Sequence, residues 1–258
     1  MSQSRRGGLV KLAREFDALV VSDDAYDFLR WPADQMKPLD TDLGSLPPRL
    51  VDIDKSLEGG TKYGNTVSNG SFSKIVAPGT RVGWLEAAET FISAMAKVGV
   101  TSSGGGPSHL TSTFMKNMIS TGALEKHIAE TLIPTYSSRY HSMMAAIRSQ
   151  LFPLGMKITT GDIGDSVGGF FTSLSTPDHL PPTSVLASSA LQDHRLKFAY
   201  GEMFEVFGDK ASKERAEAPG GFGHTLRLCW SWHTEEEIED GMSRLSNALR
   251  DLISPSMT

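Results

Sequence analysis

A short apolar run, Ala18-Leu19-Val20-Val21, is the feature that most limits how this chain can fold. Apolar residues at helical spacing precede it, and acidic and aromatic residues follow it directly. Four apolar residues between a helix and a polar turn predict a buried strand of an α/β sheet. Ligands of open α/β sheets bind at the carboxyl ends of the strands. The sequence therefore predicts that Asp23 and Tyr26, which follow this strand, lie beside a ligand.

A second segment places an amine, two hydroxyls and a guanidinium close together along the chain. These groups belong to Ser71, Ser73, Lys74 and Arg81. A lysine amine forms an imine with an aldehyde, while hydroxyls and a fixed positive charge suit a phosphate. Taken alone, Lys74 would be an ordinary solvated lysine. Together with an upstream acid that could keep a pyridine nitrogen protonated, the segment predicts a site for pyridoxal phosphate.

These motifs, joined by Leu226-Arg227-Leu228, resemble the class I/II aminotransferases, fold type I of the pyridoxal phosphate enzymes. The match is best to the branch that includes 2-aminoadipate and aromatic aminotransferases, and it covers nearly the whole chain. The resemblance implies a role for each matching site residue. Lys74 would bind the cofactor as an imine, Asp23 would pair with its pyridine nitrogen, and Tyr26 would donate to its ring oxygen. The phosphate would be held by Ser71, Ser73 and Arg81. Arg227 would bind the α-carboxylate of the substrate.

The same resemblance implies a fold and an assembly. The fold would be the C-terminal part of the large mixed-sheet domain followed by a small α/β domain, and two subunits would form a homodimer. Family members carry a substantial segment before the Asp-x-x-Tyr strand, with a glycine turn at the phosphate, an aromatic that stacks on the cofactor and an asparagine at the ring oxygen. This sequence begins about one helix before that strand. We therefore expect a truncated form with reduced activity.

Further helices and strands are predicted from local patterns. Strands are expected at Leu50–Ile53, Thr66–Asn69, Arg81–Leu85, Phe170–Leu174 and Thr225–Trp232. Helices are expected at Gly122–Gln150, where Pro134 would break a backbone bond, near Ser184–Gln192, and after the capping box formed by Thr234 and Glu237. The stretch 37–48, rich in Pro, Asp and Gly, would be a surface excursion. We place a partial large domain at 1–135 and a small domain at 136–258.

Composition limits the compartment and the partners. The formal net charge is −5, whereas binding to nucleic acid or to a membrane surface relies on dense positive charge, so neither partner is expected. No apolar segment is long enough to span a membrane, the start lacks the apolar core of a secretory signal, and cytoplasm is the expected location. Cys229, in an apolar run, is expected to be buried. No histidine has zinc-ligand spacing, so no metal is expected.

Three functions remain open from the sequence. The first is an aminotransferase that moves an amino group between an amino acid and a 2-oxo acid. The second keeps the cofactor but catalyses elimination, carbon–sulfur lysis or an ACC synthase-like reaction, because these chemistries share one electron sink. The third is a non-catalytic fragment of an aminotransferase, which the absent upstream groups would explain.

Overall fold

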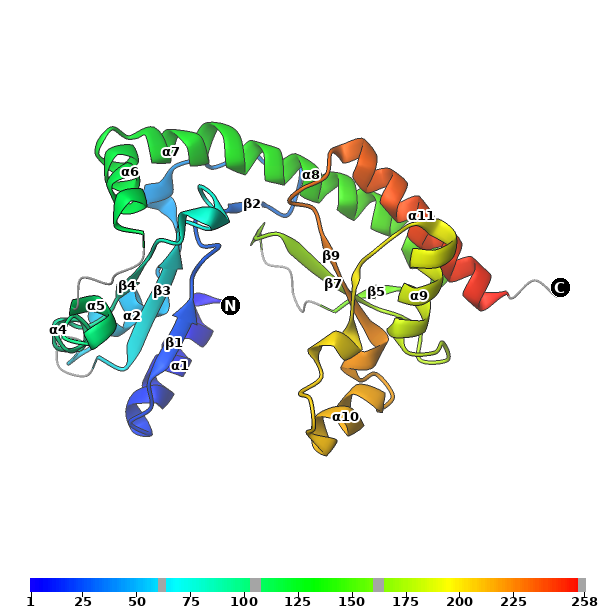
Figure 1. The fold of residues 1–258 in the computed structure, drawn as a ribbon, viewed down its shortest axis with the longest axis horizontal. Helices are drawn as coiled ribbons and strands as arrows, with labels where there is room; N and C mark the ends of the chain where they lie inside the picture. Colours follow the sequence, from blue (N-terminus) through cyan, green and yellow to red (C-terminus); the bar gives the residue numbers. More distant parts are fainter. Residues whose placement is uncertain (60–63, 103–107, 160–164, 255–258) are drawn as a thin grey trace. The chain divides into compact units, whose positions relative to one another are not determined.

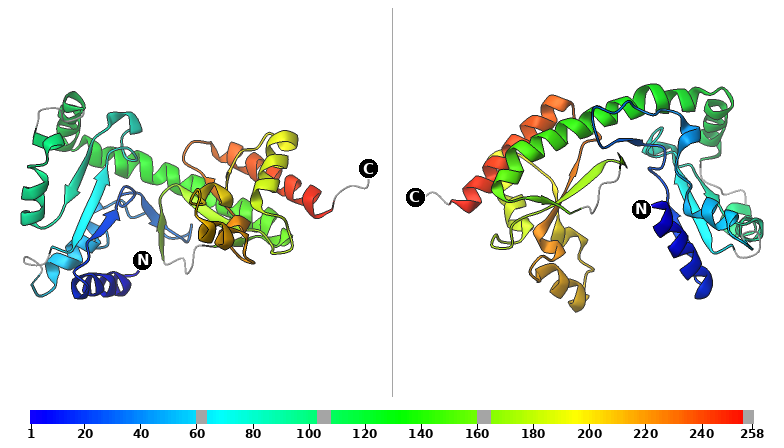
Figure 2. Two further views of the ribbon diagram at one scale, coloured as in Figure 1. Left: turned by 60° about the horizontal axis from the view of Figure 1, so that its bottom comes forward. Right: turned by 180° about the vertical axis from the view of Figure 1, so that it is seen from behind.

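The computed structural model describes residues 1–59, 64–102, 108–159 and 165–254. It consists of two compact units (Figures 1 and 2). The first is formed by Met1–Arg30 with Leu39–Ile133, and the second by Trp31–Pro38 with Pro134–Thr258. Each unit combines helices with a sheet, which confirms the predicted α/β class. The division into domains 1–135 and 136–258 stays a prediction.

The first unit is built on a sheet with the strand order β1-β3-β4 (Figure 1). β1 runs parallel to β3, with Asp23 opposite Asn69, and β4 runs antiparallel to β3. The strand predicted at Thr66–Asn69 is therefore confirmed, and the strand predicted at Arg81–Leu85 is present but begins two residues later, at Gly83. The elements of this unit are α1 (Gln3–Glu15), β1 (Val20–Asp23), α2 (Leu50–Ser56), β3 (Thr66–Ser71), β4 (Gly83–Glu86), α4 (Glu89–Met95), α5 (Gly99–Ser102), α6 (His109–Ser120) and α7 (Ala123–His127).

The strand predicted at Leu50–Ile53 is wrong, because these residues form the first turn of α2. Asp52 accepts a hydrogen bond from the backbone N–H of Arg49 at 2.8 Å, so the helix start is capped. Leu50 and Ile53 are buried against Val10 of α1 in a small apolar core. A short apolar run fits a buried helix turn as well as it fits a strand, and only the tertiary contact distinguishes the two.

A buried ion pair joins α1 to α2. Arg14 Nη2 lies 2.7 Å from Asp54 Oδ1, and both side chains are largely buried. The second carboxylate oxygen of Asp54 accepts hydrogen bonds from the Asn65 N–H and the Thr66 hydroxyl. The carboxylate is therefore fully paired, which a buried charge requires. It fixes both helices to the start of β3.

The expectation that the Ala18–Val21 run is buried is wrong for one face of β1. Val21 is 60% exposed and Leu19 is 49% exposed, although Val20 packs on the core of α1 and α2. Within the described residues β1 pairs with β3 alone, so it forms an edge of the sheet. Alternation along the strand places Val21 on the face that no described element covers closely.

Gly70 of β3 lies directly opposite Trp84 of β4. A Cβ atom built on Gly70 would lie only 2.1 Å from the indole carbon Cε2. The indole also packs edge-on against Phe72, with ring centroids 4.9 Å apart. Because Gly70 has no side chain, there is room for the indole to pack against Phe72. Phe72 lies two residues before Lys74, so this contact positions the start of the lysine segment.

We expect Gly70→Ala to destabilise the protein by about 1–3 kcal/mol, because the added methyl forces Trp84 out of its packing. Urea unfolding followed by circular dichroism measures this change. Gly79→Ala is the matched control, since a Cβ at Gly79 meets nothing within 4 Å. Equal unfolding midpoints for the two variants would show that the indole moves aside without cost.

The second unit is built on a sheet with the strand order β5-β7-β9-β8, in which the pairs are antiparallel. A separate two-stranded pair joins β2 to β6. The strands are β2 (Arg30–Pro32), β5 (Lys157–Ile158), β6 (Ser166–Gly168), β7 (Phe171–Ser175), β8 (Ala199–Tyr200) and β9 (Thr225–Cys229), and the helices are α8 (Ile133–Ala146), α9 (Thr183–His194), α10 (Lys210–Glu217) and α11 (Glu235–Ile253). The strand predicted at Phe170–Leu174 is confirmed to within one residue, and the strand predicted at Thr225–Trp232 is present but ends at Cys229.

Helices α9 and α11 pack together in the second unit (Figure 2). The predicted capping box is present, since Thr234 Oγ1 accepts from the Glu237 N–H and Glu237 accepts from the Thr234 N–H. Leu226 and Leu228 of β9 are buried, whereas Cys229 is exposed. The prediction of a buried Cys229 is therefore wrong. Cys229 directly follows Leu228, and alternation along the strand places the two side chains on opposite faces of the sheet.

The helical pattern predicted over Gly122–Gln150 is confirmed and contains two π turns. The first, Ile128–Leu132, follows α7 and ends two residues before Pro134. The second, Ile147–Leu151, follows α8. Pro134 has no N–H for the helix ladder, and a π turn is one way to accommodate such an interruption. No described helix is long and apolar enough to cross a membrane.

Candidate active site

The first part of the candidate site lies at the carboxyl end of the parallel pair β1 and β3. Asp23 is the last residue of β1 and is exposed. After it the chain turns, with the Asp27 N–H donating to the Asp24 carbonyl and the Leu29 N–H donating to the Tyr26 carbonyl. The turn leaves Tyr26 half-buried at this edge. The predicted position of Asp23 and Tyr26, at a strand end where ligands bind, is thus the one observed.

The lysine segment follows β3 at the same edge. Phe72 and Ile75 are buried and anchor the turn, while Ser73 and Lys74 between them are half-buried. The Ser71 hydroxyl accepts a hydrogen bond from the Ser73 N–H at 3.0 Å. Two apolar anchors therefore hold a short polar turn whose hydroxyls and amine remain near the surface.

Lys74 is brought close to Tyr26. The Lys74 Nζ lies 5.6 Å from the centroid of the Tyr26 ring. The two residues are 48 positions apart in the chain, and the parallel pairing of β1 with β3 places them together. An amine beside a phenol, with the Asp23 carboxylate at the same sheet edge, can hold and polarise a carbonyl compound.

Arg81 is set by an unusual backbone conformation. It follows the 3-10 turn Pro78–Thr80 and has a φ of +51°, in the left-handed region that few non-glycine residues adopt. Its Nη1 donates to the Pro78 carbonyl at 2.9 Å, and the residue is exposed. This hydrogen bond uses one guanidinium nitrogen, and the group carries further N–H donors that can meet an anion.

Arg227 belongs to the second unit, on β9 opposite Ser173 of β7. Its guanidinium lies between two rings, 4.4 Å from the centroid of Phe171 and 4.9 Å from that of Phe204. It makes no side-chain hydrogen bond to the residues that the structure describes. It lines a cavity of about 680 Å³ that Met203 and Trp232 also line. This fork of donors is available to a carboxylate.

Sequence reasoning missed the two rings beside Arg227. Phe171 could have been found, because it lies two residues before Ser173 and strand alternation puts both on one face with Arg227. Phe204 is the last residue of the 3-10 turn Gly201–Phe204, and no pattern in the sequence predicts its place. The described residues contain no group of three or more His, Cys, Asp or Glu that could hold a metal.

Comparison with known proteins gives a consistent result. The family profile described as Aminotransferase class I and II matches residues 6–245. An uncharacterised protein of Saccharomyces cerevisiae is 36% identical over 214 residues, which cover 81% of this chain and 45% of that protein. Aromatic-amino-acid aminotransferase 1 of Thermococcus litoralis is 26% identical over 257 residues, which cover 97% of this chain and 51% of that protein. The chain spans about half the length of these curated relatives.

A solved structure agrees with the sequence comparisons. Kynurenine aminotransferase of Pyrococcus horikoshii, crystallised with PMP, matches with a TM-score of 0.73 at 25% identity, over 98% of this chain and 53% of that chain. The match confirms the predicted fold, that of the fold type I aminotransferases. The Thermococcus and Pyrococcus proteins are both named as aminotransferases.

Proposed function

Because this chain belongs to the class I and II aminotransferases, we propose that it takes part in transferring an amino group between an amino acid and a 2-oxo acid, with pyridoxal phosphate as cofactor. The observation that carries this proposal is the placement of the Lys74 amine 5.6 Å from the Tyr26 ring, at the sheet edge that also presents Asp23. This surrounding differs from that of an ordinary solvated lysine on a protein surface.

The groups at this edge fit the cofactor by their chemistry. Lys74 supplies the amine that would bind it covalently, Asp23 a carboxylate for the pyridine nitrogen, and Tyr26 a phenol for the ring oxygen. The Ser71 and Ser73 hydroxyls and the Arg81 guanidinium would hold the phosphate. When bound, pyridoxal phosphate supplies an electron sink for the bonds at the α-carbon of the substrate.

The residues of the chain would supply binding and proton transfer. Arg227 would bind the α-carboxylate of the substrate through two parallel hydrogen bonds, and the flanking rings keep its guanidinium in one orientation. Lys74 Nζ would be the base that moves the proton at the α-carbon. The apolar walls beside Arg227, including Phe171 and Trp232, favour substrates with a large apolar or aromatic side chain. The names of the Thermococcus and Pyrococcus relatives point to the same substrate class.

We expect Arg227→Gln to lower kcat/KM for transfer from phenylalanine to 2-oxoglutarate on the order of 100-fold, because two charge-assisted hydrogen bonds to the carboxylate are lost. The assay couples formation of the 2-oxo acid to its absorbance. Arg215→Gln is the matched control, since Arg215 lies on α10 with an exposed side chain. Equal losses in both variants, or none in Arg227→Gln, would remove Arg227 from the proposed site.

We further propose that the active form is a homodimer, as the family resemblance suggests. A self-complementary interface of two identical copies is the commonest solution for a small assembly. Light scattering of the purified chain should give twice the mass of 27.9 kDa. A mass of one chain at all concentrations tested would count against the dimer.

A further inference from the structure

The first unit contains a second cavity, of about 400 Å³, that the proposed reaction does not use. Its walls come from β3 and β4, from the turn after β1 and from the stretch that precedes α2. The apolar part of the wall includes Phe28, Leu46 and Trp84, and the polar part includes Asp27 and Arg30. A volume of this size with apolar walls and a few polar groups is typical of a small-molecule site.

The cavity and the proposed cofactor site lie on opposite faces of β1 and β3. Ser68 and Glu86, which pair across the sheet, both line the cavity. Asp23 and its partner Asn69 alternate with these positions and point to the other face. The cavity is therefore separate from the edge at which Asp23 meets the cofactor.

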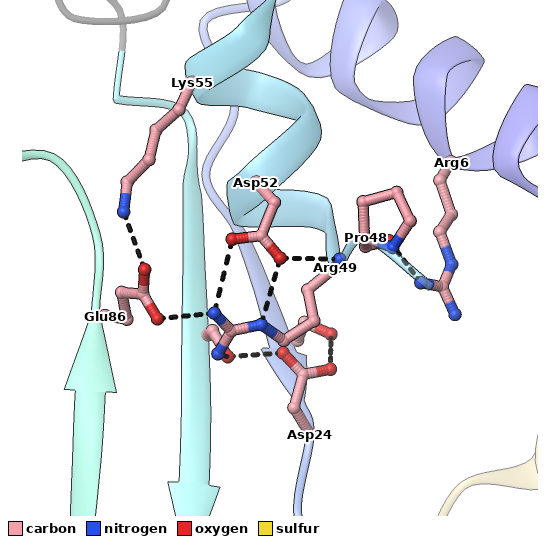
Figure 3. A network of polar contacts seen from close by, with 9 residues as sticks. Arg6, Asp24, Pro48, Arg49, Asp52, Lys55 and Glu86 are labelled. Carbon is pink, nitrogen blue, oxygen red and sulfur yellow. Dashed lines mark hydrogen bonds and ion pairs between the residues drawn. The ribbon is translucent and has the colours of Figure 1, made fainter. Parts of the chain in front are cut away.

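Several charges in the cavity wall already neutralise one another (Figure 3). Arg49 donates to both oxygens of Asp52 and, at 2.6 Å, to Glu86. Glu86 also accepts from Lys55 at 2.7 Å, and this hydrogen bond lowers the pKa of Glu86. Asp24 accepts from the hydroxyls of Ser22 and Ser68. This network has no need of a ligand.

Asp27 and Arg30 lie outside that network. One carboxylate oxygen of Asp27 is buried and has no hydrogen-bond partner among the described residues. Burial raises the pKa of Asp27, and the neighbouring Asp24 raises it further. Arg30 makes no side-chain hydrogen bond or ion pair to the described residues, and burial lowers its pKa. The opposite charges of Asp27 and Arg30 attract each other, which offsets part of the cost of burial. Hydrogen-bond partners are still lacking for the buried oxygen of Asp27 and for the Arg30 guanidinium among the described residues, which is costly unless a ligand supplies them.

We propose that this cavity binds a free α-amino acid. Arg30 would bind the carboxylate, Asp27 the ammonium group, and the rings of Phe28 and Trp84 with Leu46 would contact the side chain. A zwitterion satisfies both protein charges at once and adds no net charge to the cavity. A simple cation or a simple anion would give hydrogen-bond partners to only one of the two side chains and would weaken its attraction to the other. The inference goes beyond the proposed aminotransferase function and does not depend on it.

Calorimetric titration of the cofactor-free chain tests this binding with three probes. L-phenylalanine should bind saturably with one molecule per chain. 3-Phenylpropionate lacks the ammonium group and 2-phenylethylamine lacks the carboxylate, so each should bind at least about tenfold more weakly, as expected for one lost charge-assisted hydrogen bond. Absence of saturable phenylalanine binding would overturn the proposal. Equal binding of all three probes would also overturn it, because the apolar wall alone would then carry the interaction.

Variants locate the bound phenylalanine. Arg30→Gln and Asp27→Asn should each weaken phenylalanine binding at least about tenfold. Leu46→Trp should abolish phenylalanine binding, because the larger side chain fills the cavity. If circular dichroism shows that Arg30→Gln or Asp27→Asn is unfolded, Leu46→Trp provides the test. Arg5→Gln is the control, since Arg5 is exposed on α1. Binding that is lost in Arg227→Gln but intact in Leu46→Trp would place phenylalanine at the other cavity and overturn the proposal.

Discussion

Lys74→Ala should abolish covalent attachment of pyridoxal phosphate and lower amino-group transfer by several powers of ten, because no other group at the sheet edge supplies both the amine and the base. The protein is incubated with pyridoxal phosphate, reduced with borohydride, digested and mapped by mass spectrometry. The reduced cofactor should be found on the peptide that contains Lys74. In the variant this modified peptide should be absent.

The structure explains why Lys74 should react before the other lysines. The buried anchors Phe72 and Ile75 hold its turn, and the Tyr26 ring lies beside its amine. Lys97, which is exposed two residues after the end of α4, is the matched control. Lys97→Ala should leave the label and the activity unchanged. A label distributed mainly over other lysines, or undiminished in Lys74→Ala, would refute the assignment.

The second large effect concerns cofactor affinity. We expect these 258 residues alone to bind pyridoxal phosphate several powers of ten more weakly than a form extended upstream with the corresponding half of the Thermococcus litoralis relative. Asp23 is exposed, and so is Val21 beside it on the open face of β1. Each hydrogen bond or packing contact that an upstream segment would add to the cofactor is worth on the order of 1 kcal/mol, and several such gains multiply in the dissociation constant.

Equilibrium dialysis of the cofactor and the rate of amino transfer, measured for both forms, make this comparison. Addition of an unrelated folded domain of similar length controls for a general gain in solubility. The open edge of β1 should also make the shorter form more prone to aggregation, because unpaired strand groups recruit other chains. Near-equal affinity and activity of the two forms would show that the described residues already make a complete site.

The sequence could predict mainly those parts of the candidate site whose residues are close together in the chain. Ser71, Ser73, Lys74 and Arg81 come from one short stretch, and their grouping needs only local turns. The approach of Lys74 to Tyr26 needed a long-range step, which the α/β pattern supplied through the rule that parallel strand ends share an edge. The rings beside Arg227 could not be foreseen in full, because Phe204 reaches its place through an irregular turn.

Sequence by itself determined the elements with a clear local signal, including α11 with its capping box and the apolar strand β9, because such signals need no distant partner. Tertiary structure alone decided the type of Leu50–Ile53, the exposure of Val21 and the exposure of Cys229. An apolar residue is buried only if another element covers its face, and no single segment records which element that is. Pairing of β1 with one strand left Val21 open, whereas packing on α1 made Leu50–Ile53 a helix.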